Sequence, residues 1–176
     1  VAEVAIQAAL TGHLVFSTLH TNDAPSAITR LIDMGVKPFL VASAIQAVMA
    51  QRLVRRLCKN CQEEYHPSEE EFEEIVKDYG KKWFDKTDIE YDQDLTLLRP
   101  KGCESCSDTG YRGRLGIHEL MEGTARVKLM IKKQASTEQI FELAMKEGMC
   151  TLKQDGIHKV FAGLTDIREV RRDSIE

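Results

Sequence analysis

The sequence predicts an α/β fold, and three observations along the chain support this prediction. Helical and strand patterns alternate at the start of the 176-residue sequence. Cysteines, charged residues and turn-forming residues concentrate in the middle, and helical patterns fill most of the remainder. We therefore expect three consecutive parts, at residues 1–57, 58–116 and 117–176. The first part has the element order of the later half of an α/β domain.

The composition indicates a folded protein with a hydrophobic core. Hydrophobic residues make up 43% and charged residues 30% of the sequence, and the formal net charge is −4. This acidic balance argues against a nucleic-acid-binding face, because such a face needs a local excess of Lys and Arg. The longest apolar stretch, residues 39–50, is shorter than the roughly twenty residues of a membrane-spanning helix, so we expect it to belong to a core helix.

Three helices are expected in the first part of the chain. An Ala-rich pattern predicts the first helix at residues 2–10. The second helix has Asp23 or Asn22 as its N-cap and ends at Gly35. The third helix follows a proline and is expected over residues 39–57.

A buried strand is predicted between the first two helices, at residues 14–19, with His13 and His20 at its two ends. The run is apolar and partly β-branched, and turn-forming residues flank it. In a regular strand the two histidines would lie about 23 Å apart on opposite faces, so they could not share one metal ion. One strand cannot form a sheet, so we expect its partner strands to come mostly from outside this chain.

Capping boxes mark helix starts in the rest of the chain. In this motif a Ser or Thr is followed three residues later by Glu or Gln, and it predicts helices that begin after Ser68, Ser136 and Thr151. The stretch "GYRGRLGIHELMEGT" contains an alternating strand between Gly-rich turns. A short last helix is expected in "TDIREVRR".

Four cysteines form the strongest chemical motif in the sequence. Cys58 and Cys61 form one C-x-x-C pair, and Cys103 and Cys106 form a second. Two such turns can present four thiolates to one zinc ion, and four thiolates leave no open position for catalysis, so a structural zinc site is predicted. A redox-active dithiol or a disulfide is the alternative. The fifth cysteine, Cys150, is expected to be a small buried hydrophobic residue.

Two groups of arginines are candidates for binding an anion. Arg52, Arg55 and Arg56 lie at the end of the third predicted helix, where the helix dipole alone could account for them; contact with phosphate or nucleic acid is the alternative. Arg112 and Arg114 lie on a Gly-flanked turn beside the second cysteine pair. They suit pairing with phosphate or with a carboxylate of a neighbouring subunit, and a solvated hairpin explains them equally well.

Four ordered motifs make the chain resemble the assembly ATPases of type II secretion and type IV pili. They are "AEVAIQAALTGHLVFSTLHTNDAPSAITRLIDMGVKPFLVASAIQAVMAQRLVRRLC", the two C-x-x-C pairs, "CSDTGYRGRLGIHEL" and "GMCTLKQDGIHKVFAGLTDIREV". Members of this family are hexameric cytoplasmic ATPases with a RecA-like core, in which Walker A, an acidic motif and Walker B precede a histidine motif. The resemblance implies that this chain, which starts at Val1, follows the end of Walker B in a longer protein.

The resemblance implies a partial RecA-like core at residues 1–57, a zinc-binding tetracysteine subdomain with an acidic helical insert at 58–116, and a mainly helical C-terminal module at 117–176. ATP and magnesium would be bound only by the full-length parent protein, an ATP hydrolase. The sequence contains no G-x-x-x-x-G-K-[ST] phosphate loop and no recognisable Ser/His/Asp set, so we expect this chain alone to be inactive.

The resemblance also implies roles for individual residues. "GHLVFSTLH" matches the histidine motif of the family, with His20 at the histidine placed toward the terminal phosphate of the nucleotide. An imidazole at the carboxyl end of a strand can report whether that phosphate is present. His13 opens the same motif, and either nucleotide binding or a local hydrogen bond accounts for it. Arg112 and Arg114 match G-Y-R-G-R and would serve subunit contacts or the nucleotide site of a neighbouring subunit.

The function implied by the resemblance is to power type II secretion or type IV pilus assembly. The expected partners are further copies of the subunit in a hexamer and the inner-membrane platform proteins, and the expected location is cytoplasmic, peripheral to the inner membrane. Secretion, pilus assembly and DNA uptake all fit the resemblance. Two alternatives are a zinc-ribbon nucleic-acid-binding module, which the acidic balance opposes, and an adaptor that docks on a membrane platform.

Overall fold

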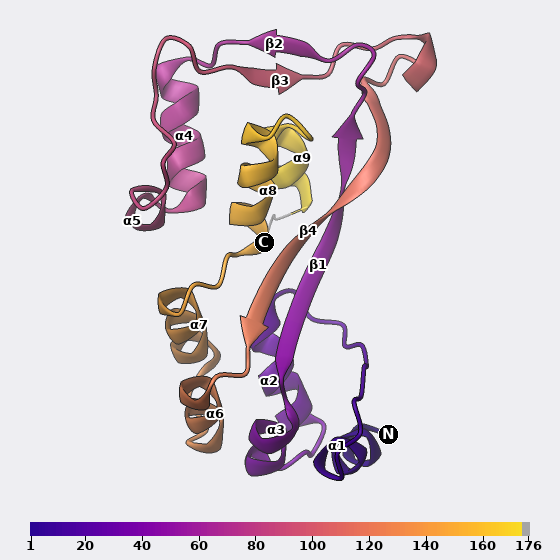
Figure 1. Ribbon diagram of the computed structural model, residues 1–176, viewed down its shortest axis with the longest axis vertical. Coiled ribbons are helices and arrows are strands. Elements are labelled where there is room, and N and C mark those ends of the chain that lie inside the picture. Colours follow the sequence, from indigo (N-terminus) through magenta and orange to yellow (C-terminus); the bar gives the residue numbers. More distant parts are fainter. Residues whose placement is uncertain (174–176) are drawn as a thin grey trace. The chain divides into compact units, whose positions relative to one another are not determined.

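The structure, a computed structural model, describes residues 1–173. The chain divides into two units, each made of two segments. Unit 1 comprises residues Val1–Ala50 and Glu119–Cys150, and unit 2 comprises residues 51–118 together with the chain from Thr151 onward. The long strands β1 (Ala47–Leu57) and β4 (Tyr111–Glu122) form a two-stranded sheet and run in opposite directions (Figure 1). The division between the units crosses both strands.

Unit 1 is built mainly from helices. They are α1 (Ala2–Leu10), α2 (Ala24–Asp33), α3 (Pro38–Ala44), α6 (Ala125–Lys132) and α7 (Thr137–Lys146). Helix α3 packs on α6, and α2 packs on α7. Their apolar faces bury Ile28, Val41, Val127, Ile131 and Ile140 almost completely, which is the main source of stability in such a helical layer.

Side-chain caps begin several of these helices. The carboxylate of Asp23 accepts the backbone N–H of Ser26 at 2.7 Å at the start of α2. At the start of α7, Ser136 and Gln139 form the capping box that the sequence predicts, with each side chain accepting the other's backbone N–H. These helix starts therefore follow from local sequence chemistry.

Unit 2 combines two small sheets with helices. Besides its part of β1 and β4 it contains β2 (Glu63–Tyr65), α4 (Glu69–Tyr79), α5 (Lys81–Phe84), β3 (Leu97–Arg99), the short 3-10 helix η1 (Glu104–Cys106), α8 (Leu152–Phe161) and α9 (Ile167–Asp173). Strands β2 and β3 pair antiparallel, with Glu63 opposite Arg99 and Tyr65 opposite Leu97.

The core of unit 2 lies between its helices and β3. Helix α8 packs on α4, α9 and β3. The buried side chains of this core are Phe72, Ile75, Tyr79, Phe84, Leu97, Ile157, Val160, Ile167 and Val170. The predicted helices after Ser68 and Thr151 are confirmed as α4 and α8, and the alternating strand is confirmed as β4. The helices after β4 divide between the units, with α6 and α7 in unit 1 and α8 and α9 in unit 2.

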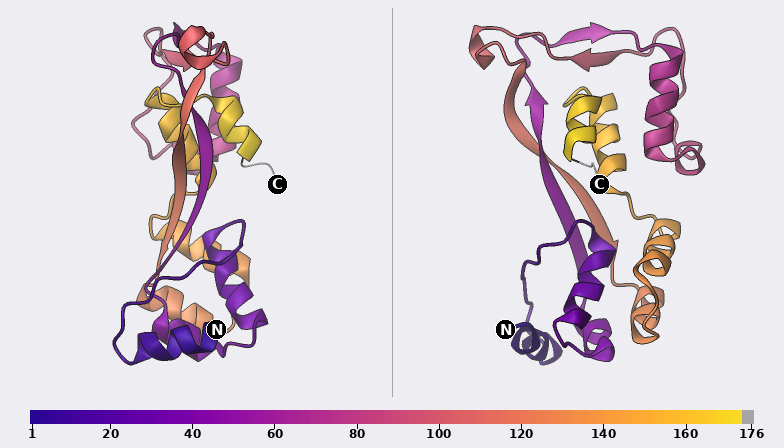
Figure 2. Two further views of the ribbon diagram at one scale, coloured as in Figure 1. Left: turned by 90° about the vertical axis from the view of Figure 1, so that its right-hand side faces the viewer. Right: turned by 180° about the vertical axis from the view of Figure 1, so that it is seen from behind.

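The strand predicted at residues 14–19 is wrong for this structure. Residues 13–20 have no regular secondary structure and are exposed, and they form the irregular trace between α1 and α2 in Figure 2. Leu14 and Phe16 are 80% and 88% exposed. A strand needs a neighbour to pair its backbone N–H and C=O groups, and no strand among the described residues pairs with this segment. The source of its partner strands stays a prediction.

The long helix predicted at residues 39–57 is also wrong. Helix α3 ends at Ala44, and residues 47–57 form β1 instead. Ala, Met, Gln, Leu and Arg in this stretch favour a helix locally, but hydrogen bonding to β4 decides the conformation. Arg52, Arg55 and Arg56 consequently lie on a strand, not in the last turn of a helix. No helix among the described residues is long and apolar enough to cross a membrane.

Candidate functional site

The two C-x-x-C pairs meet in unit 2, as the sequence predicts. Cys58 and Cys61 follow the end of β1, and Cys103 and Cys106 flank the short helix η1. The four sulfur atoms all lie within 4.8 Å of one another. The Sγ···Sγ distances are 3.9 Å from Cys58 to Cys103, 3.8 Å from Cys61 to Cys106 and 3.7 Å from Cys103 to Cys106. All four are free thiols, because a disulfide would bring two sulfurs to about 2.0 Å.

Backbone N–H groups point at these sulfurs. Gly102 donates to Cys61 at 3.3 Å, and Cys103 and Gly110 donate to Cys106 at 3.3 and 3.2 Å. Both glycines have positive φ, and a Cβ on Gly110 would lie 2.4 Å from a carbon of Pro100. Glycine is therefore required where the backbone folds tightly enough to aim its N–H groups at the thiols.

The sulfur arrangement fits a tetrahedral zinc ion. Four ligands at a zinc–sulfur distance of about 2.3 Å place neighbouring sulfurs about 3.8 Å apart. The three measured distances of 3.7, 3.8 and 3.9 Å agree with that spacing. Four thiolates would complete the coordination shell, so the chemistry available here is structural bracing rather than activation of water.

The thiol pKa values diverge within the cluster. Burial raises the pKa of Cys61, and the neighbouring thiols raise it further, to about 11, although the N–H of Gly102 opposes them. Burial also acts against the Cys106 thiolate, but the backbone N–H groups of Cys103 and Gly110 and the adjacent thiols lower its pKa to about 6. Without a cation, four adjacent thiols cannot all ionise; a bound dication removes that repulsion.

The two histidines of the N-terminal segment are both exposed. The Nδ1 atom of His13 lies 3.2 Å from the hydroxyl of Thr11, and the His13 backbone N–H donates to Ala8 at 3.1 Å. His20 lies four residues before the first residue of α2. Among the described residues neither histidine joins a metal-binding group.

A buried carboxylate holds the end of this histidine segment. Glu119 of β4 is 3% exposed and accepts the backbone N–H of Ala24, the first residue of α2, at 2.8 Å. Together with the Asp23 cap, it satisfies N–H groups at the start of α2 and places negative charge at the positive end of the helix. The chain just after His20 is therefore fixed.

Arg55 and Arg56 of β1 differ in whether they form an ion pair with a described residue. The guanidinium of Arg55 donates to the buried carboxylate of Glu169 at 2.6 and 3.0 Å and lies 4.1 Å from the ring centre of Tyr111. Burial acts against the Glu169 carboxylate, but the donors of Arg55 outweigh it and lower the Glu169 pKa. Arg55 is thus a packing residue, whereas Arg56 forms no ion pair with any described residue.

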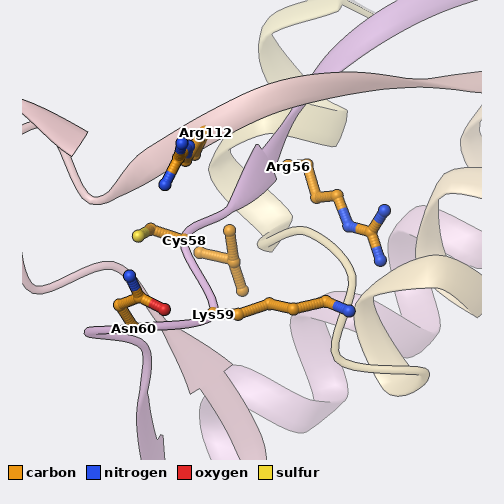
Figure 3. A pocket seen from close by; sticks show the side chains of 6 residues that line it. Arg56, Cys58, Lys59, Asn60 and Arg112 are labelled. Atoms are coloured by element: carbon orange, nitrogen blue, oxygen red, sulfur yellow. The ribbon is translucent and has the colours of Figure 1, made fainter. Parts of the chain in front are cut away.

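The two arginines of the GYRGR motif begin β4. Arg112 and Arg114 are exposed, and neither forms an ion pair with a described residue. Arg112 lines a hollow beside the cysteine cluster together with Arg56 and Lys59, whereas Arg114 does not (Figure 3).

Nearly the whole chain matches one protein family. The family described as "Type II/IV secretion system protein" matches residues 1–172. The chain belongs to this family.

Among curated members of the type II/IV secretion family, identity is high over nearly the whole chain. The type IV pilus assembly ATPase TfpB of Acinetobacter baylyi is 42% identical over 97% of this chain and 28% of its own length. The type II secretion system ATPase E of Vibrio cholerae is 44% identical over 97% of this chain and 31% of its own length. The type IV pilus assembly ATPase PilB of Thermus thermophilus is 42% identical over 99% of this chain and 19% of its own length. The chain spans less than a third of the length of these relatives.

A solved structure of similar fold is the crystal structure of the pilus retraction motor PilT with bound ADP. The TM-score is 0.60 at 20% sequence identity, and the match covers 99% of this chain and 36% of that chain. The likeness supports a mixed α/β fold similar to that of PilT.

Sequence reasoning missed two features of this family member. The first is the buried carboxylate of Glu119, which shares the buried face of β4 with Ile117 and Met121. The alternating pattern of β4 places Glu119 at a core position, and this placement could have identified it from the sequence. The hollow beside the cysteines joins residues of β1, the first C-x-x-C turn and β4. No signal in the sequence could join them while residues 39–57 were assigned to a helix.

Proposed function

We propose that this chain is the carboxyl-terminal part of a subunit of a hexameric ATPase that powers type II secretion or type IV pilus assembly. The observation that carries the proposal is the 42–44% identity, over nearly the whole chain, to relatives named as ATPases of both systems. The missing phosphate-binding and magnesium-binding elements would be supplied by the rest of the subunit, so the chain alone is expected to hydrolyse ATP negligibly.

His20 is proposed as the residue that senses the terminal phosphate of bound ATP. Its imidazole is exposed, and the chain beyond it is anchored at Ala24 by Glu119 and at Ser26 by Asp23. An exposed imidazole next to a fixed helix start can hydrogen-bond a phosphate oxygen that another part of the subunit presents. His13 is proposed as a secondary nucleotide contact, and its local bond to Thr11 is the competing role.

The cysteine cluster is proposed as a structural zinc centre. It would join the end of β1 to the segment that leads into β4. Arg112 and Arg114, which are exposed and unpaired among the described residues, are proposed to contact a neighbouring subunit or its nucleotide. The complete protein would act at the cytoplasmic face of the inner membrane, on the platform that assembles pilins or pseudopilins.

Steady-state kinetics of the complete subunit test the proposal. The variant His20→Ala should lower kcat by about tenfold or more and leave KM for ATP almost unchanged, because a sensor acts after binding. His158→Ala is the matched control, since that histidine bonds to Tyr79 within unit 2. An unchanged kcat for His20→Ala, or ATP turnover by the 176-residue chain alone, would contradict the proposal.

A further inference from the structure

A hollow of about 340 Å³ lies beside the cysteine cluster in unit 2. Its lining residues are Arg56, Leu57, Cys58, Lys59, Asn60 and Arg112 (Figure 3). We call it the basic pocket. The volume is at the lower end of the range of about 300–1,000 Å³ that is usual for small-molecule sites.

The three cations of the basic pocket form no ion pair with any residue that the structure describes. Neither Arg56, nor Lys59, nor Arg112 lies within 4 Å of a carboxylate among residues 1–173. Other cations of unit 2 have carboxylate partners: Arg55, Arg99, Lys101, Lys159, Arg171 and Arg172. Arg56 is also half-buried, so part of its hydration is lost without compensation from an acid. Arg56, Lys59 and Arg112 thus bring three positive charges to one pocket without a carboxylate among its lining residues.

The backbone under these cations is fixed. Arg56 lies near the end of β1, Lys59 lies in the first C-x-x-C turn, and Arg112 lies near the start of β4. The backbone N–H of Cys58 donates to the carbonyl of Gly110 at 2.9 Å and so joins the two segments. Figure 3 shows the side chains of Arg56 and Lys59 extending toward the same side, whereas the side chain of Arg112 extends toward the other side. Cations held on rigid backbone lose less conformational entropy when they bind a ligand.

We propose that the basic pocket binds the phosphate group of a small phosphate compound or of a lipid headgroup. The guanidinium group of Arg56 and the ammonium group of Lys59 offer the donors that phosphate oxygens accept, and guanidinium can do so with two parallel hydrogen bonds. The basic pocket belongs to unit 2 and the His20 segment to unit 1, and the proposal does not depend on the ATPase function.

A competing explanation is that the cations balance the charge of a metal-bound thiolate cluster, which would be −2. The sulfurs, however, accept their hydrogen bonds from the backbone N–H groups of Gly102, Cys103 and Gly110. The two explanations predict different results for a variant that lacks the charges of Arg56 and Lys59. If the cations balance the cluster charge, the variant should lose zinc; if they form a phosphate site, it should lose phosphate binding and keep zinc.

Calorimetric titration of the zinc-loaded 176-residue chain with inorganic pyrophosphate tests the proposal. The wild-type chain should bind pyrophosphate with an affinity that falls as salt rises. The double variant Arg56→Gln/Lys59→Gln should bind about tenfold more weakly or worse, since hydrogen bonds between charged groups are lost. Arg99→Gln is the matched control, because Arg99 is exposed and paired with Glu63 outside the pocket, and it should bind like the wild type.

Zinc content and circular dichroism of the same variants separate a folding defect from a binding defect. The proposal is supported if the double variant keeps its zinc and its fold but no longer binds pyrophosphate. Sedimentation with vesicles of phosphatidylglycerol, against vesicles of phosphatidylcholine, separates the two sources of phosphate. If the chain binds phosphatidylglycerol vesicles but not pyrophosphate, and if this binding is lost in the double variant, the phosphate belongs to a lipid headgroup. The proposal is overturned if neither probe binds, if Arg99→Gln weakens binding equally, or if the double variant binds pyrophosphate like the wild type.

Discussion

At the scale of single residues, Glu169 is the carboxylate on which the polar contacts of unit 2 converge. It is 2% exposed and accepts the backbone N–H of Arg55, the Arg55 guanidinium and the guanidinium of Arg172. Next to it, the hydroxyl of Tyr111 donates to Asp166. Burial and this hydrogen bond raise the pKa of Tyr111, so the phenol stays neutral over the physiological range.

Replacing Glu169 by Gln should destabilise unit 2 strongly. The substitution keeps the size of the side chain but removes the charge that pairs with Arg55, and loss of one partner of a buried ion pair costs about 3 kcal/mol. The half-exposed partner, Arg55, reduces the effect, so we expect about 2–3 kcal/mol in the free energy of unfolding by urea. Glu63→Gln, at a surface ion pair with Lys101, is the control and should destabilise the chain far less, because solvent screens an exposed pair. Equal effects of the two variants would refute the argument.

The same carboxylate predicts a pH dependence. Its pKa is lower in the folded chain than in the unfolded chain, so its contribution is fully present above the unfolded value of about 4.3 and is lost as pH falls through the folded pKa. The difference in unfolding free energy between wild type and Glu169→Gln should therefore be constant from about pH 7 to 5 and shrink below about pH 4. Urea unfolding at each pH measures it. A difference that grows on acidification would contradict this sign.

Residues of the candidate site differ in how far the sequence could predict them. The four cysteines were predictable because a C-x-x-C turn encodes the ligand geometry within four residues. The Arg55–Glu169 pair was not, since 114 residues separate its members and no local pattern joins them. His20 is exposed because its segment forms no strand and pairs with no strand among the described residues.

At the scale of elements, the local sequence determines where helices start, whereas strand formation depends on residues far along the chain. The capping boxes at Ser136 and Thr151 place helix starts where the sequence predicts them, because each box lies within four residues. The predictions for residues 47–57 and 14–19 are both wrong, because a strand forms only where a neighbouring strand pairs its backbone N–H and C=O groups. Residues 47–57 have β4 as a neighbour and form a strand, whereas residues 14–19 have no strand neighbour in the described chain and form none.

The start of α2 is the element whose position matters most for the proposed phosphate sensor. Glu119→Ala should remove the acceptor of the Ala24 N–H and the charge at the helix N-terminus, at a cost of about 1–2 kcal/mol. Hydrogen exchange followed by mass spectrometry should show faster exchange in the first turn of α2. The first turn of α6, capped by Thr124, is the internal control and should be unchanged. Unchanged exchange in α2 would show that Asp23 alone holds the helix start.

At the scale of the whole molecule, the division into two units predicts an uneven response to metal. All four cysteines lie in unit 2, in the range Gln51–His118. A metal ion that binds only the folded site stabilises the unit that contains it. The single tryptophan, Trp83, also lies in unit 2, beside the core that α4 and α8 share, so its fluorescence reports on that unit.

Removal of zinc should therefore destabilise unit 2 and leave unit 1 nearly unchanged. With a chelator and a reductant present, unfolding followed by Trp83 fluorescence should shift to lower urea concentration, and amides of α8 and β2 should exchange faster. Amides of α3 and α6, which pack on each other in unit 1, should keep their exchange rates. Cys61→Ser should reproduce the effect without chelator, and Cys150→Ser, outside the cluster, is its matched control. Equal acceleration in both units would mean that the chain unfolds as one cooperative body, because destabilising one unit would then open the other.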